Sequence, residues 1–272
     1  METRIGMFGA ALVLAAGTAM AQYATDVINY NHGTGFATEF GSGAGYTNSA
    51  AAIGEPSKVT PGDFGGPVDP FSPPYTRDQV VSIGTGGSLT VKFTSPIVHD
   101  ASHPYGLDFT IFGDTGFSIV NGDFGGGGVT DGSLFNPRGA VTTVSVSADG
   151  ANFFKLNPSL APVIGDYYPT DGSGNFGLPL NPALKPGDFA GANMAKIRSL
   201  YAGSAGGASY SLAWAIDGAG STVAIDAVNF IRIDVLSGAA QVDGISAVVP
   251  EPGVVALAGL GLVGVFVFGR RK

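Results

Sequence analysis

The sequence predicts a mostly β protein: an antiparallel, jelly-roll-like β-sandwich with one short helix, an N-terminal signal peptide and a C-terminal hydrophobic tail helix. Three observations support this prediction. Several short runs alternate apolar and polar residues, with the two-residue period of a half-buried strand. The chain contains 44 Gly and 17 Pro, which suit turns between many short strands. Only one segment has the spacing of apolar residues that an amphipathic helix requires.

The first 21 residues have the features of a secretory signal peptide. Arg4 gives a positive start, and an almost wholly apolar stretch follows at 7–16. Ala19 and Ala21 fit the small-x-small rule of signal peptidase, so we expect cleavage before Gln22. A buried N-terminal helix is the alternative, but the run is short and lacks a capping residue. The predicted parts are a signal peptide (1–21), a secreted β-sandwich domain (22–249) and a C-terminal tail (250–272).

Strand patterns recur along the predicted domain. They cover the segments 88–93, 107–112, 144–148, 152–156, 209–216, 230–236 and 242–249. In the sixth segment Ile231, Ile233 and Val235 share one face, and Arg232 and Asp234 lie on the other. Asp149 and Gly150 join the third segment to the fourth and are typical of a two-residue hairpin turn. Gly244 weakens the last strand.

One helix is predicted after Asp188, which can cap its N-terminus. The apolar face consists of Phe189, Met194, Ile197, Leu200 and Tyr201. Gly203 is placed to end the helix. We expect this helix to cover an end or an open edge of the sandwich.

Charge and composition exclude several classes of function. Residues 22–249 hold 19 acidic and 9 basic side chains, a net charge near −10, whereas nucleic-acid binding needs clustered Lys and Arg. The chain has no Cys, which excludes thiol catalysis, thiolate metal sites and iron–sulfur clusters. No G-x-S-x-G nucleophile elbow is present. These features favour a secreted or surface protein that does not bind nucleic acid.

Two histidines, His99 and His103, are four residues apart and would face one metal ion if they lay on a helix. Because Pro96 and Pro104 flank them, we expect a loop, and we prefer a solvated loop to a metal site. The Gly-rich stretch 82–88 lacks the Lys and Ser/Thr of a phosphate-binding loop, so it is expected to be a turn between two strands.

Carboxylates at the ends of predicted strands are the candidate metal ligands, in particular Asp108, Asp234 and Asp243. On converging loops of a sandwich such oxygen atoms could hold a structural Ca²⁺. The stretch 171–177 begins like a calcium loop, but Pro182 stands where an EF-hand requires Glu. Ordinary Asx-turns are the competing interpretation. We therefore expect no resident cofactor, with a structural Ca²⁺ as the alternative.

Aromatic residues in predicted loops are the candidate ligand-binding residues. Tyr75 lies in "SPPYTRD", and Tyr167 and Tyr168 lie in "IGDYYPTDG". Aromatic faces stack on the apolar faces of ligands such as sugars. These tyrosines therefore indicate polysaccharide as a candidate partner.

The chain ends with an acidic-proline tripeptide, an apolar run and a basic end. The residues are Pro250, Glu251, Pro252, Arg270, Arg271 and Lys272. This order resembles the PEP-CTERM sorting signal, found on exported proteins of Gram-negative bacteria that make extracellular polysaccharide. The resemblance implies that a membrane exosortase recognises the tripeptide, processes the chain near it and passes the protein to the outer envelope.

The apolar run at 254–268 has 15 residues, or about 22 Å as a helix at about 1.5 Å per residue. A hydrocarbon core is about 30 Å thick, so this run is short for a permanent anchor. The basic end is expected to stay cytoplasmic. We therefore expect the tail to hold the chain in the inner membrane only in transit.

The segments "GLDFTIFGDTGF", "VSVSADGANFFKL" and "FIRIDVLSGAAQVDGISAV" follow one another in the predicted domain. Through them, residues 80–248 resemble a family of bacterial cell-surface β-sandwich proteins. The resemblance implies a sandwich ectodomain but brings no activity and no catalytic residue with it.

Two functions from different classes follow. The first is a non-catalytic binding or structural module of the cell envelope or extracellular matrix, sorted by an exosortase-like system and associated with exopolysaccharide. The alternative is a secreted glycan-active hydrolase using two carboxylates such as Asp108 and Asp234, which would have to face one groove. The expected partners are signal peptidase, an exosortase-type protease and a polysaccharide.

Overall fold

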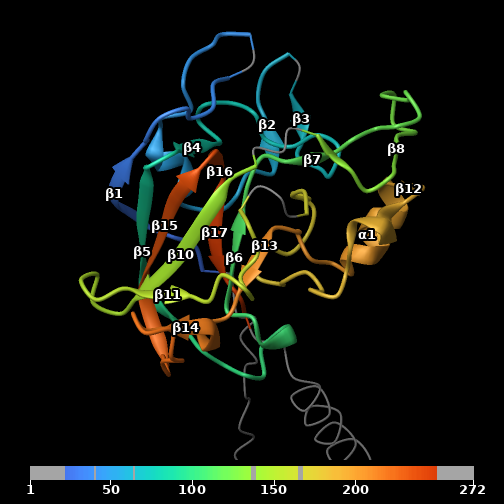
Figure 1. Cartoon of the computed structure of the whole chain (residues 1–272). Helices are drawn as coiled ribbons and strands as arrows, with labels where there is room; N and C mark the ends of the chain where they lie inside the picture. The colour runs from blue at the N-terminus through green and yellow to red at the C-terminus, as the bar shows by residue number, and fades with distance from the viewer. Residues whose placement is uncertain (1–21, 40, 64, 136–138, 165–167, 250–272) are drawn as a thin grey trace, which may run out of the picture. The chain divides into compact units, whose positions relative to one another are not determined.

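The computed structural model describes residues 22–249, apart from 40, 64, 136–138 and 165–167 (Figure 1). The predicted signal peptide and sorting tail lie outside the described residues. Within the described part, regular structure consists mainly of antiparallel strands with a single α-helix. No helix of that part is long and apolar enough to cross a membrane. The prediction of a mostly β, antiparallel protein with one short helix is confirmed.

The largest sheet has six strands and contains most of the predicted alternation. Its order is β1 (Asp26–Asn31), β5 (Ser88–Val98), β15 (Ala227–Ser237), β10 (Val141–Ser147), β11 (Phe154–Leu156) and β14 (Ala215–Ile216). Its central strands bury side chains such as Leu89 and Val144. The register pairs Ile233 with Leu89 and Ile231 with Val91, so that neighbouring strands present one continuous apolar face.

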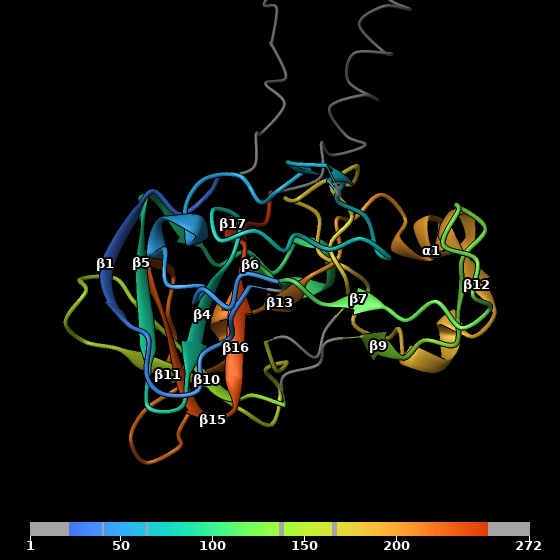
Figure 2. The ribbon, with the colours of Figure 1, turned by 90° about the horizontal axis from the view of Figure 1, so that it is seen from above.

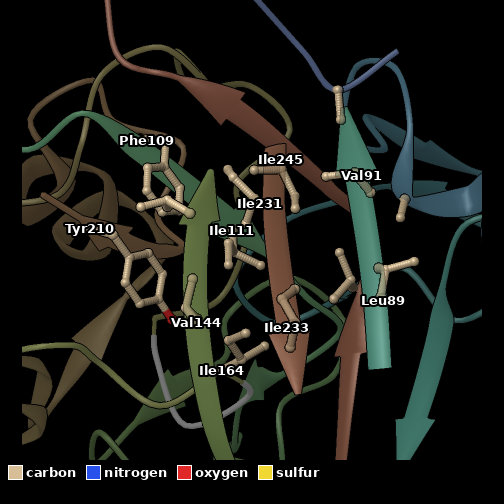
Figure 3. Close-up of a cluster of buried hydrophobic side chains, with 14 of the residues drawn as sticks. Leu89, Val91, Phe109, Ile111, Val144, Ile164, Tyr210, Ile231, Ile233 and Ile245 are labelled. Atoms are coloured by element: carbon tan, nitrogen blue, oxygen red, sulfur yellow. The ribbon is translucent and has the colours of Figure 1, made fainter. Parts of the chain in front are cut away.

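Two smaller sheets contribute side chains to the same core. One has the order β13 (Ala208–Tyr210), β6 (Phe109–Phe112) and β17 (Gly244–Ala247), and the other pairs β16 (Ala239–Val242) with β4 (Val81–Gly84). Figure 3 shows Phe109, Ile111 and Ile245 gathered with Ile231 and Ile233 of the six-stranded sheet. Removing this apolar area from water holds the sheets together, at about 25 cal/mol for each Å² buried.

A second apolar cluster surrounds the helix α1 (Met194–Tyr201). Figures 1 and 2 both place α1 away from the six-stranded sheet, beside β12, which pairs with β8. In the described part, the other strands are β2 (Val59–Thr60), β3 (Gly66–Pro67), β7 (Gly116–Phe117), β8 (Val129–Thr130), β9 (Leu134–Phe135) and β12 (Ala192–Asn193). The 3₁₀ turns there are η1 (Ser49–Ala52), η2 (Pro104–Gly106), η3 (Pro186–Phe189) and η4 (Leu212–Trp214).

The helix begins later than predicted. Asp188 belongs to the turn η3, where its carboxylate accepts a hydrogen bond from the backbone N–H of Lys185 at 2.7 Å. Asn193 caps α1 instead, because its side chain accepts from the N–H of Lys196 at 3.0 Å. The helix ends at Tyr201, and the next residue, Ala202, caps it in the left-handed conformation with φ of 51°.

Three strand predictions were wrong in detail, and in the first two a side chain competes for nearby backbone N–H groups. Segment 209–216 breaks where the Ser211 hydroxyl accepts from the N–H of Ala213 and starts η4. The loop between β10 and β11 is longer than two residues, because Asp149 accepts from the N–H groups of Ala151 and Asn152. Segment 242–249 divides at Asp243, which separates β16 from β17.

Replacing Phe109 tests the shared core. Phe109 is fully buried and stacks on Tyr210 with ring centroids 5.1 Å apart. Phe109→Ala should lower the free energy of unfolding by about 3–5 kcal/mol, because it leaves a cavity between the sheets. Urea unfolding curves measure this loss. The matched control, Phe124→Ala at a side chain that is 80% exposed, should change stability by less than about 0.5 kcal/mol. Equal losses at both positions would contradict the assignment of this core.

Candidate functional site

A cleft of about 540 Å³ is the largest of the hollows described for this domain. Its lining residues are Thr38, Glu39, Gly41, Gly43, Tyr46, Pro73, Pro74, Tyr75, Asp114 and Phe135. They come from the loops at 38–46 and 73–75, from Asp114 shortly after β6, and from Phe135 in β9. The volume falls within the range of about 300–1,000 Å³ that is typical of small-molecule sites.

Two aromatic side chains are accessible at this cleft, Tyr75 at 38% and Phe135 at 46% exposure. The backbone at Tyr75 is held in place by Tyr46, whose buried ring donates a hydrogen bond from its hydroxyl to the Tyr75 carbonyl at 2.6 Å. Phe135 pairs with Gly116 across β7 and β9. A Cβ at Gly116 would lie 2.6 Å from the Phe135 ring, so only glycine allows the ring to lie there.

Two carboxylates also line the cleft. Glu39 accepts a hydrogen bond from the Ser42 hydroxyl at 2.6 Å and pairs with Arg77 at 3.3 Å. These two neighbours, the Ser42 hydroxyl first, hold the pKa of Glu39 below its usual value. The second carboxylate, Asp114, is buried, with 5% of its surface exposed. An ionised Glu39 therefore offers a hydrogen-bond acceptor at neutral pH, which suits ligand hydroxyl groups.

The predicted ligand-binding tyrosines do not share one surface. Tyr75 lines the cleft. Tyr168 is half-buried in the second cluster, where its ring lies 5.1 Å from that of Phe189 and its hydroxyl donates to the Leu184 carbonyl. Tyr168 lines different hollows. Tyr167 lies outside the described residues.

The expectation of solvated histidines was wrong for His103, which is 7% exposed. His103 Nδ1 lies 3.0 Å from Oδ1 of Asp108, and His99 Nδ1 lies 2.9 Å from Oδ2. The fully buried Asp108 also accepts from the backbone N–H of Leu212 at 2.7 Å. A buried carboxylate needs such donors to replace water, so this group ties a loop to the turn η4. The sequence carried no signal for it beyond an acid between two apolar residues.

The other two candidate metal ligands lie in different surroundings. Asp234 forms an ion pair with Arg232 on β15 at 2.7 Å, and both side chains are partly exposed. Asp243 accepts from the backbone N–H of Ser57 at 2.8 Å and from its hydroxyl at 2.6 Å. Over residues 22–249, leaving aside the few that are not described, no three His, Cys, Asp or Glu side chains are grouped to hold a metal ion. The structure thus does not bring these three acids together.

Asp243 is a buried acid whose pKa is raised far above its ordinary value. Burial raises its pKa to about 7, with the negative charge of Asp114 acting in the same direction and the Ser57 hydrogen bonds opposing it. In the unfolded chain an Asp titrates near pH 4. The folded protein therefore holds one more proton than the unfolded chain between about pH 4 and pH 7.

This difference makes stability depend on pH. Since the folded state binds the extra proton, the Asp243 contribution should be largest at low pH and fall by about 1.4 kcal/mol per unit as the pH rises from about 4 to 7. Asp243→Asn, which resembles the protonated acid, should flatten this slope in urea unfolding curves. The exposed Asp63→Asn serves as the control and should keep the wild-type slope. An unchanged slope in Asp243→Asn would show that Asp243 does not carry the proton.

Comparison with known proteins concerns the C-terminus alone. No curated protein sequence matches the chain. Residues 248–272 match the family model described as the PEP-CTERM protein-sorting motif. This match confirms the resemblance of the tail, including the tripeptide from Pro250 and the basic end at Lys272. Because proteins with this motif are exosortase substrates, the chain is an exported protein that is sorted at a membrane toward the cell surface.

Proposed function

We propose that this protein is a non-catalytic, polysaccharide-binding module of the cell envelope or extracellular matrix. The observation that carries the proposal is the cleft, which combines two accessible aromatic faces with carboxylate acceptors. Sugar rings present apolar C–H faces and hydroxyl groups, and this combination matches both features. Tyr75 would stack on the ring, and Glu39 would accept from its hydroxyls.

The sequence features at the two ends of the chain support export of the domain to the cell surface. We infer that signal peptidase cuts before Gln22 and that the tail at 254–268 spans the inner membrane of a Gram-negative cell only in transit. Cleavage near Pro250 would then release the domain to the outer surface. We further infer that the six-stranded sheet and the smaller sheets are the layers of a jelly-roll-like sandwich, which their shared apolar cluster supports.

Loss of the Tyr75 ring should weaken glycan binding. Tyr75→Ala should reduce affinity for the exopolysaccharide of the host strain by about two- to tenfold, since one stacking contact contributes about 0.5–1.5 kcal/mol. Affinity electrophoresis or calorimetry measures the change. Tyr75→Phe keeps the ring and should bind like the wild type. Phe124→Ala, an exposed aromatic outside the cleft, should also leave binding unchanged.

Repeating the measurement with Ca²⁺ and with a chelator tests for a structural calcium ion. Loss of binding in the chelator would show that a Ca²⁺ ion is required. Equal binding in both conditions would contradict a role for Ca²⁺ in binding. Failure of the wild-type protein to bind the polysaccharide in either condition would overturn the proposed function.

A glycan-active hydrolase is the second candidate, and one observation favours it: Glu39 and Asp114 line the same cleft. The acids expected for this role do not fit it, because Asp108 is fully buried beneath its donors and Asp234 pairs with Arg232. General acid catalysis favours a carboxyl with a raised pKa, and that of Glu39 is lowered. Release of reducing ends from the polysaccharide, abolished in both Glu39→Gln and Asp114→Asn, would establish the hydrolase.

Charge reversal of the tail tests the export route. Replacing Arg270, Arg271 and Lys272 with Glu should strongly reduce surface delivery, because the basic end holds the tail's orientation in the membrane. Surface labelling of intact cells and fractionation measure delivery. The control replaces the exposed Lys155, Lys185 and Lys196 with Glu and should be delivered normally. Normal surface labelling of the tail variant would contradict the role of the basic end.

A further inference from the structure

A second hollow lies at another place on the domain and shares no lining residue with the cleft of Tyr75. Its volume is about 170 Å³, and a cavity of about 150 Å³ admits a benzene-sized ring. The hollow therefore has room for one six-membered ring. Its lining includes Leu107, Tyr168, Leu180, Asn181, Ser209 and Trp214.

Apolar and aromatic side chains line the hollow. Leu107 and Leu180 are buried, at 2% and 4% exposure. Trp214 and Tyr168 are half-buried and line the same hollow. Such rings pack against the C–H face of a pyranose.

Hydrogen bonds within the protein fix the backbone at Trp214 and the side chain of Tyr168. The carbonyl of Trp214 accepts from the N–H of Asn157 at 2.8 Å, and the same turn is held by the bond from Leu212 to the buried Asp108. The hydroxyl of Tyr168 donates to the Leu184 carbonyl. A site whose walls are already ordered loses less entropy when it binds a ligand.

Asn181 supplies the polar group of the site. Its side-chain oxygen accepts from the N–H of Ala183 at 3.0 Å, which orients the amide. Its Nδ2 group has no hydrogen-bond partner among the residues that the structure describes. The amide thus has donors available for a ligand hydroxyl.

We propose that this hollow binds a single pyranose unit, as a second contact point for the polysaccharide. The choice of a sugar rests on the proposed function, whereas the existence of the site rests on the hollow itself. Binding the same chain at two points would raise the overall affinity without any new contact at the cleft.

Trp214 is the one tryptophan of the chain, so its fluorescence reports this hollow, whereas the cleft is lined by Tyr and Phe. The full-length protein is titrated with the monosaccharides and short oligosaccharides of the exopolysaccharide. We expect a saturable change in tryptophan emission that persists in Tyr75→Ala. In Asn181→Asp, which keeps the acceptor for Ala183 but loses the donors, the apparent Kd should rise by about tenfold.

The outcomes separate the two proposals. Polysaccharide binding that depends on Tyr75 without any change in Trp214 emission would overturn the second site and leave the proposed function intact. A saturable sugar response in Trp214 that survives Tyr75→Ala would support the second site even if Tyr75 proves dispensable. A response to phenol but to no sugar, or an unchanged Kd in Asn181→Asp, would overturn the pyranose assignment.

Discussion

One apolar layer, shared by the six-stranded sheet and the smaller sheets, is the constraint on which the rest of the domain depends. Each sheet alone would leave an apolar face in water. Ile231 and Ile233 on one side and Phe109 and Ile111 on the other cover each other in a single cluster. This packing also fixes one side of the cleft. Asp114 and β7 come directly after β6, so the burial of β6 in the core fixes their positions. A rigid core thereby positions the loops that carry the accessible aromatic side chains.

Asp108 fixes loops that border this core. A charged carboxylate in a dry environment is costly unless several donors surround it. The protein meets this requirement with two histidines and the N–H of Leu212. The same bonds fix the turn η4 and with it Trp214. The sequence suggested Asp108 as a metal ligand or a catalytic acid. The structure explains it better as a structural residue that fixes a turn beside the second hollow.

The acidic side chains near the cleft support the proposed binding role more than the proposed catalytic one. Glu39 is held ionised by Ser42 and Arg77, as a hydrogen-bond acceptor should be. The acid with a strongly raised pKa, Asp243, is buried against Ser57 and lines neither hollow. Its raised pKa makes the stability of the fold depend on pH. The acidic side chains of the domain thus differ in role: Asp108 supports the structure, Asp243 links stability to pH, and Glu39 is the acceptor in the proposed function.

Sequence alone determined the antiparallel strands and the sorting signal, because both depend on local order along the chain. Alternation places every second side chain of β5 and β15 on one face whatever the partner strand is, and the motif at 248–272 is recognised as a linear pattern. Only the tertiary structure decided which loops meet. Tyr75 and Phe135 are far apart in sequence, as are Asp108 and Leu212, and no local period links them. Some helix and strand ends differ from the prediction for a local reason: the side chains of Asn193, Ser211 and Asp149 accept hydrogen bonds from N–H groups two or three residues ahead, which a pattern of alternating polarity does not detect.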